Sequence, residues 1–187
     1  MEITKEILMD APIIAAVKEP AGLEKALASE CRVIFLLWGT ILNIEELVKR
    51  VQNSGKLCVV HIDLVEGLSN RDIAVDGLVK LCKPDGIIST RVPQIRRARQ
   101  LGVPVIQRSF MLDSMSLQNL LAQIETTRPD FIEILPGILP GVIREITGKT
   151  SIPLIAGGLI RSKQDVIQAL QAGVVAVSTS CQDVWGM

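Results

Sequence analysis

The segment PLIAGGLIRSKQDVIQALQAGVVAVSTS, residues 153–180, contains a complete strand–helix–strand unit. Its two ends are short apolar runs, which are typical of buried strands. Between them, Ser162 and Asp165 have the spacing of a capping box at a helix start, and Gly173 marks the helix end. Because strands that are apolar on both faces must be covered by their connecting helices, the segment predicts two parallel strands joined by a helix.

The same alternation of apolar run and helical pattern continues along the whole chain. Strand-like runs are present at residues 13–17, 33–38, 57–64, 86–90, 103–108, 131–135, 154–156 and 174–178. Neighbouring runs are separated by enough chain for one helix and two short loops. Eight such units predict an α/β fold, a compact (β/α)8 barrel of the TIM type. The alternative is a doubly wound open sheet, whose two edge strands would be more polar.

The length of the chain limits how such a barrel can be completed. Its 187 residues are fewer than the roughly 250 of a typical (β/α)8 barrel, and only residues 181–187 follow the last strand. We therefore expect a single domain over residues 1–187 that lacks a full final outer helix. Ile3, Ile7 and Leu8 lie on one helical face, so the N-terminal segment is expected to cover the gap beside the last strand, unless a second copy does so in a homodimer.

Composition excludes several classes of protein. The 20 basic and 20 acidic side chains give no net charge, and 48% of the residues are hydrophobic, which excludes a disordered chain. The longest apolar runs are far shorter than the roughly 18 residues that span a bilayer, and the first ten residues lack the apolar stretch of a signal peptide. We expect a cytoplasmic protein that does not associate with membranes.

Cysteine and histidine usage argues against a metal centre. The four cysteines, at positions 31, 58, 82 and 181, form no CxxC pair, and His61 is the single histidine. This spacing fits no zinc module, so no metal ion or cofactor is expected. Because most of the cysteines adjoin apolar runs, they are predicted to be buried free thiols.

The loops after the last two strands carry the strongest functional signal. Gly157 and Gly158 follow the seventh strand, and Ser178, Thr179 and Ser180 end the eighth. Glycines let a backbone approach an anion closely, and a short helix starting near Thr179 would direct its positive end to the same point. These two loops commonly bind phosphate in (β/α)8 barrels, which is the function we expect here. The alternative is a tight turn and a capped helix without a ligand.

Charged residues of three other strands form a second candidate cluster. Lys18 follows the first strand, Asp63 lies in the third and Glu133 in the sixth. Facing one another in the barrel mouth, they could bind sugar or glycerol hydroxyls, perform acid–base chemistry, or form a structural ion-pair network. His61 lies two residues before Asp63 and is expected on the same face, as a packed, hydrogen-bonded ring rather than a catalytic base.

Positive charge is concentrated locally in the segment RVPQIRRAR, residues 91–99. Its arginines could bind RNA phosphates without sequence preference. Alternatively, they solvate the outer face of a helix and complement its C-terminus. The sequence pI of about 6.6 and the 3% aromatic content provide neither a global attraction to nucleic acid nor a broad surface for base stacking.

Six stretches of the chain together resemble one protein family. They are VVHIDLVEGLS (59–69), PDGIISTR (84–91), VIQRSFMLDS (105–114), PDFIEILPGILP (129–140), PLIAGGLIRS (153–162) and AVSTSCQDVW (176–185). In this order they are similar to the glycerol-uptake operon antiterminator family, the glycerol-3-phosphate-responsive regulators of bacteria. The resemblance implies a compact barrel that binds glycerol 3-phosphate and then acts on the leader mRNA of a glycerol-uptake operon, so that transcription passes a terminator.

The resemblance also implies roles for individual residues. The phosphate would be held at Gly157, Gly158 and Thr179, with Ser178 and Ser180 nearby. The glycerol end would face Lys18, Asp63, Gln107 and Glu133, with Arg91 and Arg108 beside them. The candidates for RNA contact are Arg91, Arg96, Arg97 and Arg99. No residue is assigned a catalytic role, and the alternative function is a TIM-barrel isomerase, lyase or transferase acting on a phosphorylated three-carbon substrate.

Overall fold

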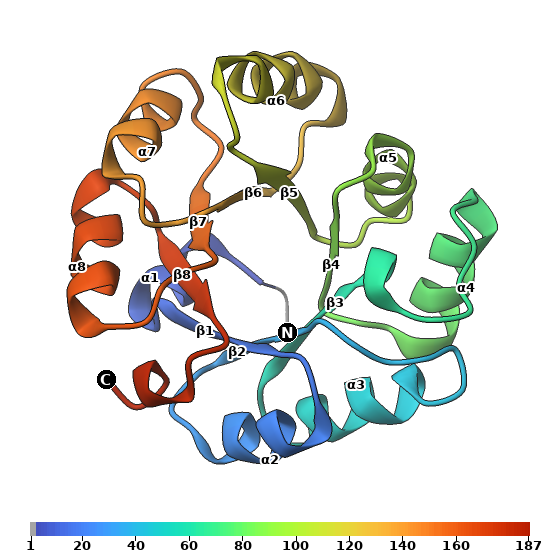
Figure 1. The fold of residues 1–187 in the computed structure, drawn as a ribbon. Helices are drawn as coiled ribbons and strands as arrows, with labels where there is room; N and C mark the ends of the chain where they lie inside the picture. Colours follow the sequence, from blue (N-terminus) through green and yellow to red (C-terminus); the bar gives the residue numbers. More distant parts are fainter. Residues whose placement is uncertain (1–2) are drawn as a thin grey trace.

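Eight parallel strands form a closed barrel in which every strand pairs with its neighbours in sequence and β8 pairs with β1 (Figure 1). The computed structural model describes residues 3–187. The strands are β1 (Ile13–Val17), β2 (Val33–Leu36), β3 (Leu57–His61), β4 (Gly86–Ser89), β5 (Val105–Phe110), β6 (Phe131–Leu135), β7 (Leu154–Gly157) and β8 (Ala176–Thr179). The predicted (β/α)8 barrel is confirmed, and closure of the sheet excludes the doubly wound alternative.

Helices cover the outside of the barrel (Figure 1). The covering helices are α2 (Pro20–Ala28), α3 (Ile44–Asn53), α4 (Asp72–Cys82), α5 (Val92–Gln100), α6 (Ser114–Thr127), α7 (Pro140–Thr147) and α8 (Lys163–Ala172). A short helix, α1 (Lys5–Asp10), precedes β1, and the 3-10 turns η1 (Ile62–Leu64) and η2 (Gln182–Val184) follow β3 and β8. None of the helices within residues 3–187 combines the length and the apolar character that crossing a membrane requires.

The predicted capping box is present at the start of α8. The Asp165 N–H donates to the Ser162 hydroxyl at 3.2 Å, and the Ser162 N–H donates to the Asp165 carboxylate at 2.9 Å. Gly173 ends the helix with a φ of +113°. These bonds fix where α8 begins and hence the shape of the loop between β7 and α8.

The N-terminal segment has a different role from the one predicted. Ile3 and Leu8 are buried in the cluster of side chains that fills the barrel interior, together with Ile14, Ala16, Val33, Phe35, Leu57, Val59, Ile88, Ile106, Phe131, Ile155 and Ala176. The segment therefore closes the amino end of the barrel rather than the gap beside β8. The reason is steric: α1 ends just before β1, so its apolar face meets the open floor of the barrel first.

The gap beside β8 is filled by the C-terminal residues themselves. Val184 and Trp185 are buried in the outer core, and η2 lies between α8 and α2 in the ring of helices (Figure 1). The indole Nε1–H of Trp185 donates to the Thr179 carbonyl at 2.8 Å. A full final helix is absent, as predicted, but a single turn anchored by a tryptophan closes the ring. A second copy of the chain is therefore not needed to cover the gap beside β8, and the homodimer stays a prediction.

The cysteines are as predicted for a chain without disulfides. All four are free thiols; Cys31, Cys58 and Cys82 are buried and Cys181 is partly exposed. Burial raises the pKa of the Cys31, Cys58 and Cys82 thiols, because the thiolate loses its hydration there. These three side chains therefore act as small apolar groups in the core.

Candidate functional site

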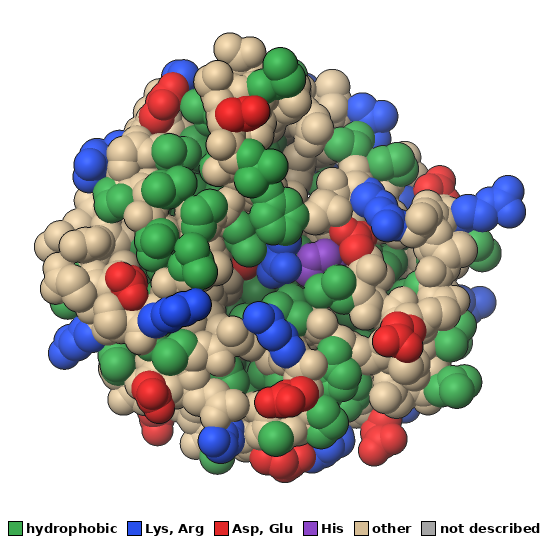
Figure 2. Space-filling view, in the orientation of Figure 1, with side chains coloured by type: hydrophobic (Ala, Val, Ile, Leu, Met, Phe, Trp, Pro, Cys, Tyr) green, Lys and Arg blue, Asp and Glu red, His purple; other side chains and the backbone are tan. Residues whose placement is uncertain are grey.

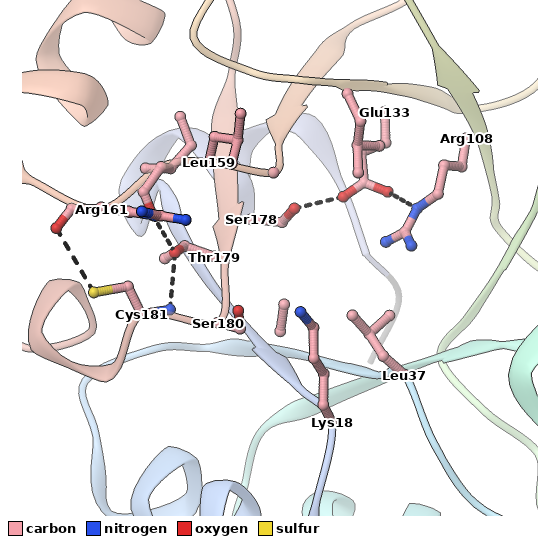
Figure 3. Close-up of a pocket in the computed structure, with 14 residues that line it drawn as sticks. Lys18, Leu37, Arg108, Glu133, Leu159, Arg161, Ser178, Thr179, Ser180 and Cys181 are labelled. Atoms are coloured by element: carbon pink, nitrogen blue, oxygen red, sulfur yellow. Dashed lines mark hydrogen bonds and ion pairs between the residues drawn. The ribbon is translucent and has the colours of Figure 1, made fainter.

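A pocket of about 430 Å³ opens at the carboxyl ends of the strands (Figure 3). Its walls come from β1, β2, β5, β6, β8 and the loop between β7 and α8. The lining residues are Ala16, Lys18, Leu37, Arg108, Glu133, Leu135, Gly158, Leu159, Ile160, Arg161, Ser178, Thr179, Ser180 and Cys181. In the space-filling view it is the hollow at the centre of the barrel mouth (Figure 2).

A buried ion pair forms the floor of the pocket. Nε of Arg108 donates to Oε2 of Glu133 at 2.5 Å, and the hydroxyl of Ser178 donates to Oε1 of the same carboxylate at 2.5 Å (Figure 3). The Glu133 side chain is 0% exposed and that of Arg108 is 8% exposed. A buried carboxylate needs such partners, so of the three roles left open for Glu133 the contacts favour the structural ion pair, with Arg108 rather than Lys18 as its partner.

Gly157 is required by this network and does not line the pocket. A Cβ atom at position 157 would lie 2.6 Å from Oε1 of Glu133 and 2.8 Å from the Ser178 hydroxyl. No side chain fits between them. The first glycine of the Gly-Gly pair therefore makes room for the buried network, whereas Gly158 is the one that reaches the pocket.

The backbone is strained where the loop between β7 and α8 passes the pocket. Gly158 has a φ of +73°, and the next residue, Leu159, has a φ of +62°. Positive φ is uncommon for a residue with a bulky side chain and is concentrated at ligand sites. The glycine was predicted from the sequence; Leu159 was not, because a leucine gives no signal for this conformation.

The hydroxyls at the end of β8 have separate roles. Thr179 donates to the Ile160 carbonyl at 2.6 Å and accepts from the Cys181 N–H at 3.0 Å, so it ties the two loops together. Ser178 is bonded to Glu133 on the floor. Ser180 is exposed at the pocket wall, so it is the hydroxyl placed to meet a ligand.

Positive charge exceeds negative charge in the pocket lining. Three cations line it, Lys18, Arg108 and Arg161, against the single carboxylate of Glu133. Lys18 reaches in from β1, and Arg161 extends over the wall formed by β8 (Figure 3). Neither forms an ion pair with any described residue. Sequence reasoning missed Arg161, although its place directly after the glycine loop, in GGLIR, was the available signal.

Asp63 does not face the pocket, contrary to the prediction. β3 ends at His61, and the chain then turns into η1, so the strand alternation that would place Asp63 with His61 stops. The carboxylate accepts the hydroxyls of Ser89 and Thr90, both at 2.7 Å, and the Thr90 N–H at 2.8 Å. Burial opposes ionisation of Asp63, but these hydrogen bonds hold its pKa below the usual range.

Gln107 also points away from the pocket, so its predicted place at the glycerol end is wrong. Ile106 lies in the barrel interior and Arg108 lines the pocket, so the residue between them faces outward. Its amide donates to Gln123 at 2.9 Å and accepts from Thr127 at 2.7 Å, both on α6. Gln107 therefore fastens α6 to the barrel.

His61 is packed as predicted, but its ring is not fully hydrogen-bonded. The side chain is 3% exposed, and Nδ1 has no partner among the described residues. Burial and the nearby charge of Arg108 lower the pKa of His61 to about 4, so the imidazole is neutral at physiological pH. It is visible as the purple group within the central hollow (Figure 2).

Two of the four candidate RNA-binding arginines form ion pairs. Arg97 is paired with Asp76 of α4 at 2.6 Å, and Arg99 with Asp130 at 3.5 Å. Arg91 is the N-cap residue of α5, at the barrel mouth, and its Nη1 is buried. Of the four, Arg96 is exposed on α5 and forms no ion pair with the described residues.

Sequence and structure comparisons agree on the relatives of this chain. One relative is the uncharacterized protein YgcP of Escherichia coli (strain K12), which is 44% identical over 96% of this chain and 94% of its own length. The crystal structure of the glycerol uptake operon antiterminator regulatory protein from Listeria monocytogenes str. 4b F2365 is 41% identical. It superposes with a TM-score of 0.90, covering 92% of this chain and 94% of that one.

A second solved structure is also similar to this chain in both sequence and fold. The glycerol uptake operon antiterminator-related protein from Thermotoga maritima MSB8 is 34% identical, with a TM-score of 0.83 over 94% of this chain and 98% of its own. The sequence model for the glycerol-3-phosphate responsive antiterminators matches residues 13–185, from the first strand to the tryptophan that closes the barrel. The chain is therefore a member of the glycerol-3-phosphate responsive antiterminator family.

Proposed function

We propose that the pocket binds glycerol 3-phosphate and that the occupied protein acts on the leader mRNA of a glycerol-uptake operon. The observation that carries this proposal is the positive charge of Lys18 and Arg161, unpaired among the described residues, beside the strained backbone at Leu159. A phosphate ester supplies the dianion that two unpaired cations favour. Membership of the glycerol-3-phosphate responsive antiterminator family supports the same ligand.

The phosphate group is expected against the loops after β7 and β8. There it would meet the backbone at Gly158 and Leu159, the hydroxyl of Ser180, and the cationic heads of Lys18 and Arg161. Backbone N–H groups and cations together bind phosphate strongly because their hydrogen bonds are charge-assisted. The three-carbon end would then point across the floor toward the ion pair.

The RNA contact is expected outside the pocket, on the outer face of α5. Arg96 supports this assignment because it is exposed and has no acidic partner among the described residues. The net charge of zero means that such a contact depends on local cations rather than on the whole protein. Ligand in the pocket can change RNA affinity only by binding one conformation of the protein more tightly than another.

The test measures leader-RNA binding with and without glycerol 3-phosphate. We expect the ligand to raise RNA affinity at least about fivefold, within the usual range for coupled sites. Arg161→Gln should abolish this response, whereas the matched control Lys163→Gln, two residues away on exposed α8, should keep it. An RNA affinity that does not respond to the ligand would contradict the proposed function.

Incubating the protein with glycerol 3-phosphate distinguishes a sensor from an enzyme, because only an enzyme converts the ligand. A sensor returns glycerol 3-phosphate unchanged, and phosphorus NMR of the mixture reads this directly. Phosphorylated products that accumulate with protein concentration would favour the TIM-barrel enzyme instead.

A further inference from the structure

A groove of about 280 Å³ lies on the outside of the barrel between α3 and α4, which are neighbours in the ring of helices (Figure 1). It shares no lining residue with the pocket at the barrel mouth. The residues that line it are all uncharged: Ile41, Ile44, Gly67, Leu68, Ser69, Ile73, Ala74, Gly77, Leu78, Leu81 and Cys82. Together with Leu42, which follows Ile41 and is 92% exposed, they form the surface that we call the α3/α4 face.

The α3/α4 face exposes large apolar side chains to solvent. On α4, Ile73 is 68% exposed and Leu81 is 65% exposed, and Ile41 and Leu42 add to them at the end nearest the barrel mouth. A single exposed apolar side chain is ordinary on a protein surface, but several of them along one apolar groove mark an interaction site. A second protein surface that covered this face would remove the apolar side chains from water.

Gly77 indicates that a helix from outside the chain approaches α4 closely. It lies in the middle of α4, one turn after Ile73 and one turn before Leu81, so the three residues form one line along the helix. A glycine inside a helix destabilises it relative to alanine. A Cβ atom at position 77 would meet no described atom within 4 Å, so no contact among the described residues requires this glycine. A second helix packed at this point gives it a role, because the distance between packed helices depends on the side chains between them.

Charge along the α3/α4 face changes sign from one end to the other. Both helices begin at the barrel mouth, where exposed acidic side chains border the face, and exposed basic side chains border it toward the opposite end. The acidic residues are Glu45, Glu66 and Asp72, the basic ones are Lys49, Lys80 and Lys83, and Arg71 at the mouth end is the exception. Glu45 and Lys49 pair with each other at 2.5 Å, whereas the other four form no ion pair with the described residues. This order suits the dipole of each helix, and it gives the whole face an acidic end and a basic end.

We propose that the α3/α4 face is the interface of a homodimer, in which α4 packs antiparallel against α4 of a second copy. A two-fold axis that crosses α4 at Gly77 places Ile73 of each copy next to the partner's Leu81 and brings the two glycines together. The same rotation sets the acidic end of each face against the basic end of the other. A surface that is complementary to itself in both shape and charge favours a second copy of the chain over an unrelated partner.

Sedimentation velocity of the full chain from about 1 to about 100 µM measures the dimer, and we expect the wild type to change from monomer to dimer within this range. Gly77→Glu places a charge at the centre of the face and should weaken dimerisation at least about a hundredfold. The matched control is Gly141→Glu on α7, where a Cβ atom also meets no described atom within 4 Å, and it should dimerise like the wild type. Urea denaturation verifies that both variants are folded.

A charge exchange tests the antiparallel arrangement. In this arrangement Lys80 lies near the partner's Asp72, so Lys80→Glu and Asp72→Lys each bring like charges together and should each weaken the dimer about fivefold. The double variant restores opposite charges and should dimerise within about threefold of the wild type. A double variant that dimerises no better than the weaker single variant would contradict the antiparallel two-fold.

The interface itself is overturned by either of two results. A wild-type chain that stays monomeric at about 100 µM would mean that the α3/α4 face belongs to a different protein. A dimer that survives Gly77→Glu unchanged would place the interface elsewhere on the molecule. Neither result depends on a ligand in the barrel mouth, so the proposed function is tested separately.

Discussion

Gly157 lies directly against the carboxylate of Glu133, so closely that a Cβ atom at position 157 would be 2.6 Å from Oε1. β7 thus passes the buried ion pair with no room for a side chain. The Gly-Gly sequence combines two requirements: Gly157 accommodates the network below the pocket, and Gly158 shapes the pocket wall. The wall of the candidate pocket and a structural network therefore meet at adjacent residues.

Gly157→Ala should therefore destabilise the fold itself. We expect a loss of about 1–3 kcal/mol in the free energy of unfolding, because Glu133 and Ser178 must move to admit the methyl group. Gly141→Ala is the control, since a Cβ atom there meets nothing within 4 Å on α7. That variant should be neutral or slightly more stable. Urea denaturation measures the stability of both variants. If Gly157→Ala is as stable as Gly141→Ala, the side chains of Glu133 and Ser178 can move aside at no cost.

Glu133→Ala should be among the most damaging single substitutions. It leaves the Arg108 guanidinium buried without its carboxylate, which costs about 3–5 kcal/mol in comparable cases. Replacing the pair together, with Glu133→Leu and Arg108→Met, should recover most of this loss, because both charges are removed. Chemical denaturation of the single and double variants provides the comparison. A double variant as unstable as Glu133→Ala would mean that the damage comes from packing and not from charge.

The buried His61 predicts a specific loss of stability in mild acid. The unfolded chain binds a proton on this imidazole near pH 6.5, whereas the folded chain does so only near pH 4. Between these values the unfolded state holds more protons, so stability falls as the pH is lowered through this window. The drop between pH 7 and pH 4.5 should be about 2 kcal/mol from this residue alone.

His61→Gln should remove that part of the pH dependence. Carboxyl groups also lose stability in this range, but both chains carry the same ones, so their contribution cancels in the comparison. Stability curves of the wild-type and variant chains at pH 7 and pH 4.5 measure the difference. If the wild-type and variant chains lose the same stability between pH 7 and pH 4.5, the folded protein protonates His61 as readily as the unfolded chain does.

Arg96→Glu should weaken RNA binding in a salt-dependent way. Removal of one phosphate contact reduces the slope of log affinity against log salt by about one, and charge reversal adds repulsion. Arg32→Glu is the control, because Arg32 is exposed at the opposite end of the barrel, just before β2. Filter binding at several salt concentrations gives both slopes. If Arg32→Glu lowers the slope and Arg96→Glu does not, the RNA surface lies on the amino-end face instead.

The sequence was sufficient to predict the barrel because its strands are apolar on both faces, and only a covered parallel sheet buries such strands. Individual side chains were harder to place. Asp63 was misplaced because nothing in the sequence marks the change from strand to 3-10 turn after His61. Gln107 was misplaced because its orientation depends on strand register, and one residue of difference reverses the face.

Residues that act through backbone conformation or loop position were also missed. Leu159 has a positive φ, which a leucine in the sequence does not indicate. Arg161 lines the pocket from a loop that is tied to the end of β8 by the bond between Thr179 and the Ile160 carbonyl. The lack of a partner for Nδ1 of His61 and Nη1 of Arg91 is a property of packing that the sequence does not indicate. By contrast, the convergence of the loops after β7 and β8 on one pocket was predicted from the fold alone, since loops at the carboxyl ends of neighbouring strands meet in any such barrel.

The central claim is that Lys18 and Arg161 hold the phosphate of glycerol 3-phosphate at the loop formed by Gly158. Calorimetric titration of this ligand into the wild-type chain and into the Lys18→Gln, Arg161→Gln double variant tests it most directly. We predict saturable binding of one ligand per chain to the wild type, a loss of affinity of at least about a hundredfold in the double variant, and no measurable heat with glycerol. Equal affinity of the two proteins for glycerol 3-phosphate would contradict the account.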